Sequence, residues 1–291
     1  MEVYIKLCHV LIFITSYSYL LYSNCQRVFI MKLKPRLAAV ASVVPAGSIV
    51  ADIGADHGYL SVYLAKEKNC PRVVAVEKSA RNAEKARETV LHYNVLEKVD
   101  VRVGDGISAL EEKDGVDVLI LAGLGGLTIC RILLAAGEDL QRFKRIVLQP
   151  MGDLALVRRF LFAYGFSFVS EKIALERGFY YEIIAAEKGV EIVENPLYFE
   201  LGPRLLEGKD PLFVPWLKDK MKHCEEILQA LDRAKQHGSG GIGFNADTNS
   251  VADFDACADS SNRGRRGLRW SYFSRRYKLL KDVLKSVCPG E

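Results

Sequence analysis

From residue 48 to residue 165, short hydrophobic runs alternate with stretches whose apolar positions recur at helical spacing. The hydrophobic runs are rich in β-branched residues, which favour strands. They predict strands at 48–54, 72–78, 99–105, 116–123 and 145–150. The stretches between and after them predict helices at 79–93, with Ser79 as the N-cap, at 125–136 and at 153–164. This alternation is typical of a parallel sheet covered by helices on both faces.

The pattern changes after residue 165. Two β runs, at 166–175 and 179–187, are separated by only Glu176, Arg177 and Gly178, and so short a gap predicts an antiparallel hairpin. A dinucleotide-binding Rossmann sheet usually ends with a sixth parallel strand instead. Parallel strands followed by a C-terminal antiparallel hairpin therefore predict an α/β fold with a Rossmann-like class I methyltransferase sheet.

Beyond residue 190 the sequence becomes helical and charged. Helices are expected at 196–206, 211–237 and 270–287. The connection at 238–267 is rich in Gly, Ser, Asp and Asn, which predicts a flexible insertion. We therefore expect a methyltransferase-type domain at 31–190 and a helical, coiled-coil-like domain with a C-terminal helical hairpin at 191–291.

Residues 1–30 do not fit this organisation. The segment 7–26 carries no formal charge and has the length of a membrane span, but His9, Asn24 and several hydroxyl side chains interrupt it. No small-residue cleavage site follows it, as a signal peptide would require. Because a basic amphipathic sequence begins at Met31, a misplaced start, an anchor and a signal peptide all stay open. No membrane partner is expected unless this extension is translated.

Composition narrows the class of protein. The 291 residues are 49% hydrophobic and 26% charged, with a net charge of +4, which excludes a wholly disordered chain. The seven cysteines form no C-x-x-C pair. This pattern predicts a reduced cytoplasmic protein without disulfides or a metal site.

The first candidate for chemistry is the loop at 52–60, Asp-Ile-Gly-Ala-Asp-His-Gly-Tyr-Leu, directly after the first predicted strand. It contains Gly54 and Gly58, but Asp56 stands where a nicotinamide fingerprint has its second glycine. A carboxylate there would repel a pyrophosphate. The loop suits the aminoacyl end of S-adenosylmethionine, although an ordinary strand–helix turn is the simpler interpretation.

Later strand ends offer further polar groups. Glu77 suits hydrogen bonds from ribose hydroxyls, and Asp105 followed by Gly106 suits an adenine amino group. Either one alone is also compatible with a surface turn. The sequence Ala-Gly-Leu-Gly-Gly at 122–126 leaves room for a methyl group and an incoming base. Gln149 offers both a donor and an acceptor to a purine edge, or caps the following helix.

A basic run near the C-terminus is interleaved with aromatic residues and opposed only by Asp282, which favours RNA binding over a merely solvated helix face. The candidate RNA-binding residues are Arg263, Arg265, Arg266, Arg269, Arg275, Arg276 and Lys278, with Lys281 and Lys285 completing the run.

Taken together, these motifs resemble the bacterial TrmK family of tRNA (adenine-22-N1)-methyltransferases. The motifs that carry the resemblance are those at 52–60, 104–106 (Gly-Asp-Gly), 122–126, 148–150 (Leu-Gln-Pro) and 180–182 (Tyr-Tyr-Glu). The resemblance begins near Leu33 and implies S-adenosyl-L-methionine as cofactor and tRNA as partner. It also implies methylation of N1 of adenine 22, in the D-loop region. By position, the cofactor-binding residues it implies are Arg36, Asp52, Gly54, Asp56, Glu77, Asp105, Gly106 and Gly123.

Three features depart from the family pattern: the extension at 1–30, the long connection at 238–262, and Met151 where some relatives carry Asn. We expect catalysis by positioning, with Gln149 orienting the target base, because N1 of adenine needs no deprotonation. A methyltransferase acting on rRNA or a small molecule stays open, as does a noncatalytic RNA-binding protein of the same fold.

Overall fold

The computed structural model describes residues 31–192, 197–207, 210–236 and 262–288, without the side chains of 234–236 and 262–268. The extension at 1–30 and most of the expected insertion lie outside this part of the chain. Contacts separate residues 1–32 from 33–291, and the fold below is that of the second unit. Within the described residues, no helix is both long and apolar enough to cross a membrane.

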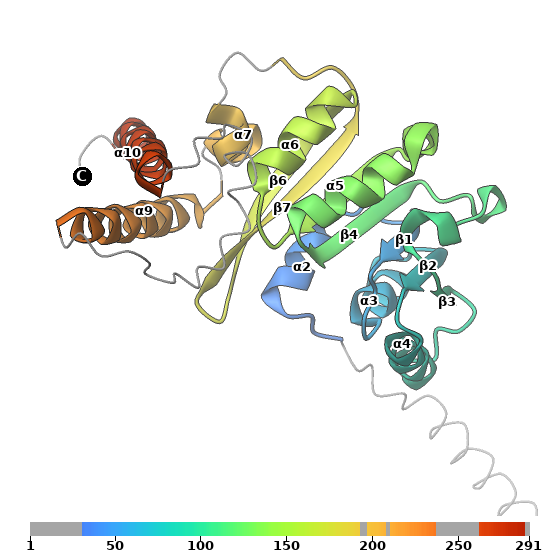
Figure 1. Cartoon of the computed structure of the whole chain (residues 1–291). Helices are drawn as coiled ribbons and strands as arrows, with labels where there is room; N and C mark the ends of the chain where they lie inside the picture. Colours follow the sequence, from blue (N-terminus) through green and yellow to red (C-terminus); the bar gives the residue numbers. More distant parts are fainter. Residues whose placement is uncertain (1–30, 193–196, 208–209, 237–261, 289–291) are drawn as a thin grey trace, which may run out of the picture. The chain divides into compact units, whose positions relative to one another are not determined.

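A seven-stranded sheet with the order β3-β2-β1-β4-β5-β7-β6 forms the centre of this unit (Figure 1). The strands are β1 (Ile49–Ile53), β2 (Arg72–Glu77), β3 (Val99–Val103), β4 (Val118–Leu124), β5 (Arg145–Pro150), β6 (Phe166–Glu176) and β7 (Phe179–Lys188). The first five are parallel, whereas β7 runs antiparallel to both β5 and β6. The predicted fold class is confirmed, including the hairpin at the end of the sheet.

Helices cover both faces of the sheet (Figure 1). On one face lie α2 (Pro35–Ser42), α3 (Tyr59–Glu67) and α4 (Ala80–His92), and on the other α5 (Gly126–Ala135) and α6 (Leu154–Ala163). Short 3-10 helices occur at Gly106–Ala109, Glu112–Asp114 and Gly137–Arg142. Ser79 caps α4 as predicted, because its hydroxyl accepts a hydrogen bond from the Asn82 N–H at 3.4 Å.

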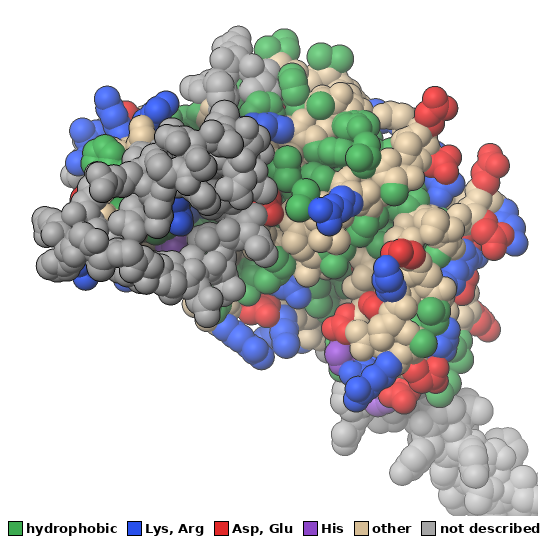
Figure 2. All heavy atoms as spheres, viewed as in Figure 1, with side chains coloured by type: hydrophobic (Ala, Val, Ile, Leu, Met, Phe, Trp, Pro, Cys, Tyr) green, Lys and Arg blue, Asp and Glu red, His purple; other side chains and the backbone are tan. Residues whose placement is uncertain are grey.

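The main core lies between the sheet and the pair α5–α6. Leu119, Leu121, Ile146 and Leu148 of the central strands are fully buried there. Each such side chain contributes about 1.5–3 kcal/mol by leaving water. The outer surface of the pair keeps exposed apolar side chains, which Figure 2 shows as green patches over both helices.

The C-terminal region is helical, as predicted. Its helices are α7 (Leu197–Leu201), α8 (Pro203–Leu206), α9 (Phe213–Gln236) and α10 (Asn262–Val287). The single helix expected at 196–206 is split at Gly202, which has φ +81° and precedes a proline. Helix α10 begins before residue 267, where the insertion was expected to end. Its arginines favour helix, and its two early glycines cost only about 1 kcal/mol each.

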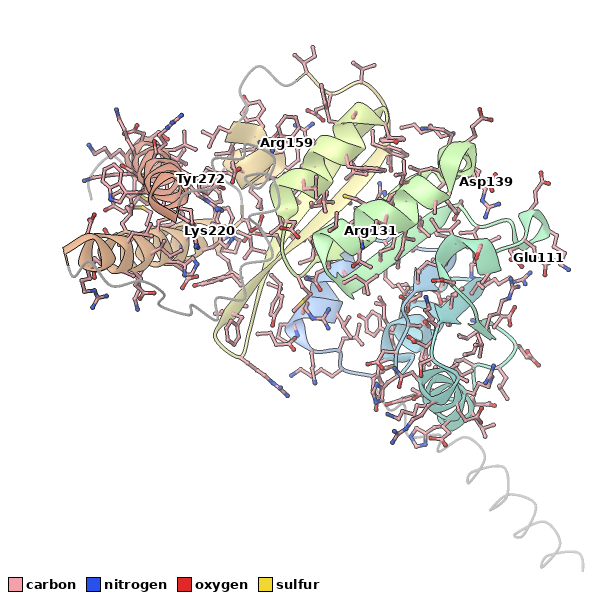
Figure 3. The ribbon with its side chains drawn as sticks, viewed as in Figure 1. Glu111, Arg131, Asp139, Arg159, Lys220 and Tyr272 are labelled. Atoms are coloured by element: carbon pink, nitrogen blue, oxygen red, sulfur yellow. The ribbon has the colours of Figure 1, made fainter. Side chains whose placement is uncertain are left out.

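The helical region packs against the β6–β7 hairpin. Its core contains Ile173 of β6 together with apolar side chains of α7 to α10. Arg158 of α6 lies fully buried at this junction, with Nε 2.7 Å from Glu171 of β6 and one terminal nitrogen 2.9 Å from Glu182 of β7. From α9, Trp216 Nε1 and Lys220 Nζ reach Glu182 at 3.1 and 2.9 Å. Figure 3 labels Lys220 on α9. These buried charges tie α9 to the sheet.

Candidate functional site

The carboxyl ends of the parallel strands meet at one edge of the sheet, where α/β proteins bind their ligands. In the register of the strands, Asp52 of β1 lies opposite Ile120 of β4, and Ala122 of β4 lies opposite Gln149 of β5. The structure therefore brings the motifs that follow β1, β2, β4 and β5 to the same edge. This edge is the candidate site.

The loop after β1 is held by backbone hydrogen bonds. Gly54 and Ala55 both donate their N–H groups to the carbonyl of Val76, at 2.8 and 3.2 Å. Gly58 has φ +72°, and a Cβ there would lie 3.2 Å from Cα of Ala86 in α4. Glycine thus allows the loop to pack closely against α4. Asp56 also adopts a left-handed conformation, with φ +48°, which aspartate tolerates better than most residues.

Asp52 is the buried acid of the site, with only 3% of its surface exposed. Its Oδ2 accepts a hydrogen bond from the Ser61 hydroxyl of α3 at 2.6 Å. Burial raises the pKa of Asp52 to about 6; the Ser61 hydrogen bond lowers it in part, and the negative charge of Glu77 adds to the rise. Sequence reasoning missed Ser61. Its only signal was one small polar residue in an otherwise apolar helix start.

Glu77 is oriented by the backbone. Its Oε1 accepts from the Ser79 N–H at 3.0 Å, and its Oε2 accepts from the Asp56 N–H at 3.1 Å. Each carboxylate oxygen keeps a second lone pair for a ligand. Among the described residues, neither Glu77 nor Asp52 forms an ion pair with a lysine or arginine.

The remaining acids of the edge are exposed. The Asp56 carboxylate lies 2.8 Å from His57 Nδ1 and has 61% of its side chain exposed. Asp105 pairs with Lys78 Nζ at 2.9 Å on the surface. Lys78 therefore competes for the oxygens that the sequence assigns to an adenine amino group.

Gln149 holds two other predicted site residues together. Its Oε1 accepts from the Arg36 guanidinium at 2.6 Å and from the Gly123 N–H at 3.1 Å. Its Nε2 donates to the carbonyl of Pro150 at 2.9 Å and lies 3.7 Å from Met151 Sδ. The side chain is fully buried. Both lone pairs and both donors are thus engaged within the chain, so a base would contact Gln149 only by replacing one of these partners.

Arg36 connects helix α2 to the hairpin. Its backbone N–H donates to Glu176 Oε2 at 3.1 Å, and its guanidinium carbon lies 5.7 Å from the centre of the Tyr181 ring. Glu176 was seen in the sequence only as a turn residue. Its contact joins segments 140 residues apart, which no local pattern reveals.

The predicted RNA-binding residues of α10 fall into different environments. Arg275 and Lys278 are exposed, and Figure 2 shows lysine and arginine side chains gathered over α10. Arg276 instead lies 3.6 Å from Glu200 and donates to the hydroxyl of Tyr272 at 3.3 Å, so it belongs to the helical core; Figure 3 labels Tyr272 on α10. Arg269 is partly buried. The side chains of Arg263, Arg265 and Arg266 lie outside the described residues.

Cys130 lies within α5 and is buried in the main core. Burial raises the pKa of its thiol to about 11, and the nearby Asp153 adds to the rise, so it is no thiolate nucleophile at neutral pH. In the part of the chain that the structure describes, no three His, Cys, Asp or Glu side chains are arranged to hold a metal ion.

The acidic side chains at this edge fit S-adenosylmethionine better than a phosphate-bearing cofactor. The edge offers carboxylates at Asp52, Asp56 and Glu77, and among the described residues none of the three is paired with a lysine or arginine. A ligand with an ammonium group, a sulfonium and ribose hydroxyls matches these acceptors. A pyrophosphate would be repelled by them.

Comparison with known proteins agrees with this geometry. The methyltransferase domain family matches residues 33–184, just over half of the chain. The chain is 29% identical to tRNA (adenine(22)-N(1))-methyltransferase of Bacillus subtilis over 70% of this chain and 87% of that protein. It is 31% identical to a Mycoplasma genitalium protein described as a candidate tRNA methyltransferase, over 68% of this chain and 87% of that protein.

A solved structure is similar over nearly the whole described chain. It is that of a Streptococcus pneumoniae protein described as a candidate tRNA (m1A22) methyltransferase, in complex with S-adenosyl-L-methionine. The TM-score is 0.69 and the identity 27%, over 87% of this chain and 100% of that chain. The chain therefore belongs to the methyltransferase domain family and, within it, to the tRNA (adenine-22-N1)-methyltransferases that its motifs resemble.

Proposed function

We propose that this protein transfers a methyl group from S-adenosyl-L-methionine to N1 of adenine 22 in tRNA. The observation that carries the proposal is the edge that holds Asp52 and Glu77 without a neutralising cation among the described residues, in a chain with a relative named for this reaction. When bound, the cofactor supplies a methyl group on a positively charged sulfur. The proposed place of the reaction is the cytoplasm.

The residues of the edge divide the binding of the cofactor between them. Glu77, fixed by two backbone N–H groups, accepts from the ribose hydroxyls. Asp52 and Asp56 face the aminoacyl end, where their negative charge favours an ammonium group. Asp105 and Gly106 would hold the adenine, and the loop at 122–126 would leave room for the methyl group.

The chain contributes positioning rather than proton transfer to the reaction. N1 of adenine has a free lone pair at neutral pH, so attack on the methyl group needs no general base. The adenine must be unstacked, aligned and shielded from water. Gln149 serves as a positioning residue, because its amide fixes both Arg36 and the backbone at Gly123. Direct contact between Gln149 and the base stays a prediction.

The exposed cations of α10 contribute phosphate contacts. Arg275 and Lys278 project from a helix that the buried network at Glu182 ties to the sheet through α9. A tRNA bound on α10 is thereby held next to the catalytic domain.

The test is methyl transfer from labelled S-adenosylmethionine by the full chain to two tRNA transcripts, one natural and one with guanine at position 22. We expect 1-methyladenosine in the natural transcript and none in the other. Label at another adenine would reject the position, and label only in rRNA or a small molecule would reject the substrate. Binding of the cofactor and of RNA without methyl transfer to any substrate would indicate a noncatalytic RNA-binding protein.

A further inference from the structure

The tip of the β6–β7 hairpin projects beyond the carboxyl edge of the sheet. Leu148 of β5 lies opposite Ile184 of β7, so the same register would place Pro150, the last residue of β5, opposite Glu182. Phe179, where β7 begins, lies three residues further out, about 10 Å at the usual strand rise. Figure 1 shows the hairpin turn extending past the neighbouring strand ends. The tip therefore flanks the opening of the candidate site.

One face of this tip is aromatic and cationic. Phe179 and Tyr181 point to the same face of the hairpin, because they are two residues apart on one strand. That face is the one turned to α2, since Glu176, which pairs with Phe179, accepts from the Arg36 N–H there. Phe179 is 67% exposed, and the Arg36 guanidinium lies over the Tyr181 ring.

The turn itself carries a cation in an unfavourable backbone position. Arg177 and Gly178 form a two-residue turn, with φ +53° and +84°. Such turns strongly prefer Asn or Asp before the glycine, because a left-handed conformation costs most other residues about 1–2 kcal/mol. Arg177 is nevertheless exposed to solvent. Nothing in its local conformation accounts for an arginine at this point.

We propose that this face, formed by Phe179, Tyr181, Arg36 and Arg177, binds a nucleotide of the tRNA beside the target adenine. The Phe179 ring stacks on a base, and Arg177 contacts the adjoining phosphate. Proteins bind unpaired RNA with this combination of exposed aromatic rings and guanidinium groups. The opposite face of the hairpin is unsuited to this role, because Tyr180 packs against the core of the helical region. The inference rests on the proposed tRNA substrate.

The test compares Phe179→Ala, Phe179→Trp and Arg177→Asn with the control Val190→Ala. Val190 is 93% exposed and lies beyond the other end of β7. For each variant, the KM for tRNA, the Kd for tRNA by fluorescence anisotropy, the Kd for S-adenosylmethionine and the melting temperature are measured.

We expect Phe179→Ala to raise the KM and the Kd for tRNA about 5- to 100-fold, the range for one lost base–aromatic stack. The Kd for S-adenosylmethionine stays unchanged, Phe179→Trp keeps wild-type tRNA affinity, and Val190→Ala behaves as wild type. Arg177→Asn should melt at the same or a higher temperature while binding tRNA several-fold more weakly, which a merely structural role would not produce.

Wild-type tRNA affinity in both Phe179→Ala and Arg177→Asn would overturn the inference, as would a weaker tRNA affinity that is matched by an equal loss in Val190→Ala. If the wild type binds tRNA through Phe179 but forms no 1-methyladenosine, the proposed reaction fails while the tRNA contact stands. If the wild type binds no tRNA, both fail.

Discussion

Two pairs of carboxylates in this protein are bound in opposite ways. At the junction with the helical region, Glu171 and Glu182 lie buried against the Arg158 guanidinium, and Glu182 also meets Lys220. At the carboxyl edge of the sheet, the partners of Asp52 and Glu77 among the described residues are a hydroxyl and backbone N–H groups. The first pair is neutralised by cations of the chain, whereas the second pair has the uncompensated charge that we propose for a ligand site.

The pKa values of the buried acids Glu182 and Asp52 are shifted in opposite directions, although burial raises both. Burial alone raises the pKa of Glu182, but the charges of Lys220 and Arg158 more than offset this and hold it below its ordinary value. For Asp52, burial raises the pKa to about 6, because a hydroxyl compensates less than a cation does. A structural carboxylate is thus recognised by its cation, and a ligand-binding one by the lack of a cation among the described residues.

The largest expected effect comes from removing the cation of the junction. Arg158→Met removes the positive charge that pairs with the buried carboxylates of Glu171 and Glu182. We therefore expect the free energy of unfolding to fall by about 3–5 kcal/mol. Urea unfolding measures this. Arg131→Met, which removes an exposed guanidinium from α5, is the matched control and should change stability by less than about 0.5 kcal/mol. An equal loss of unfolding free energy in both variants would show that the buried charges of the junction contribute no more to stability than an exposed charge does.

The opposite result is expected at the edge. Asp52→Asn removes a buried charge and keeps an oxygen for the Ser61 hydroxyl, so it should raise the free energy of unfolding at pH 7 by about 1–3 kcal/mol. The same change should weaken S-adenosylmethionine binding. Thermal unfolding and calorimetric titration measure the two effects. A variant destabilised at pH 7 would contradict the contrast with Glu182.

The pH dependence sharpens this test. The pKa of Asp52 is about 6 in the folded protein and near 3.8 in an unfolded chain, so between these values the folded state binds more protons. The stability of the wild type therefore falls as the pH rises through this window. The advantage of Asp52→Asn, measured as a difference in melting temperature, is full above pH 6 and disappears as the pH falls towards 4.

The smallest effects are expected for the cations of α10, where exposed and buried side chains can be compared in the same way. Arg275→Ala and Lys278→Ala remove exposed charges, so each should weaken tRNA binding several-fold and reduce the salt dependence of the affinity by about one ion. Arg276→Ala should instead lower the melting temperature, because its guanidinium packs against Glu200 and Tyr272. Affinity measured against salt concentration separates the two classes. Equal salt slopes for wild type and Arg275→Ala would remove Arg275 from the interface.

Periodicity alone predicted the sheet well. Every strand of the sheet begins and ends within two residues of its expected position, because buried parallel strands are nearly continuous apolar runs. The hairpin and the Ser79 cap are also local in sequence, and both were predicted.

Contacts between distant segments were not predicted. Gln149 was predicted to orient a base, and no local pattern indicated that Arg36, 113 residues earlier, donates to its side-chain oxygen. Arg276 lies in a basic run that predicts a phosphate contact, yet Glu200 and Tyr272 turn it inward. In both cases the role of the side chain depends on which distant segment packs against it. The type of residue does not reveal which segment this is.

The most direct test of the account is calorimetric titration of S-adenosylmethionine into the wild type, Glu77→Gln and Glu187→Gln. Glu187 is a carboxylate of β7 paired with Arg145, away from the candidate site. The account predicts binding at least tenfold weaker in Glu77→Gln, the equivalent of about 1.4 kcal/mol for a lost charged hydrogen bond, and unchanged binding in Glu187→Gln. Equal affinity in all three proteins would show that the acids without cations do not hold the cofactor.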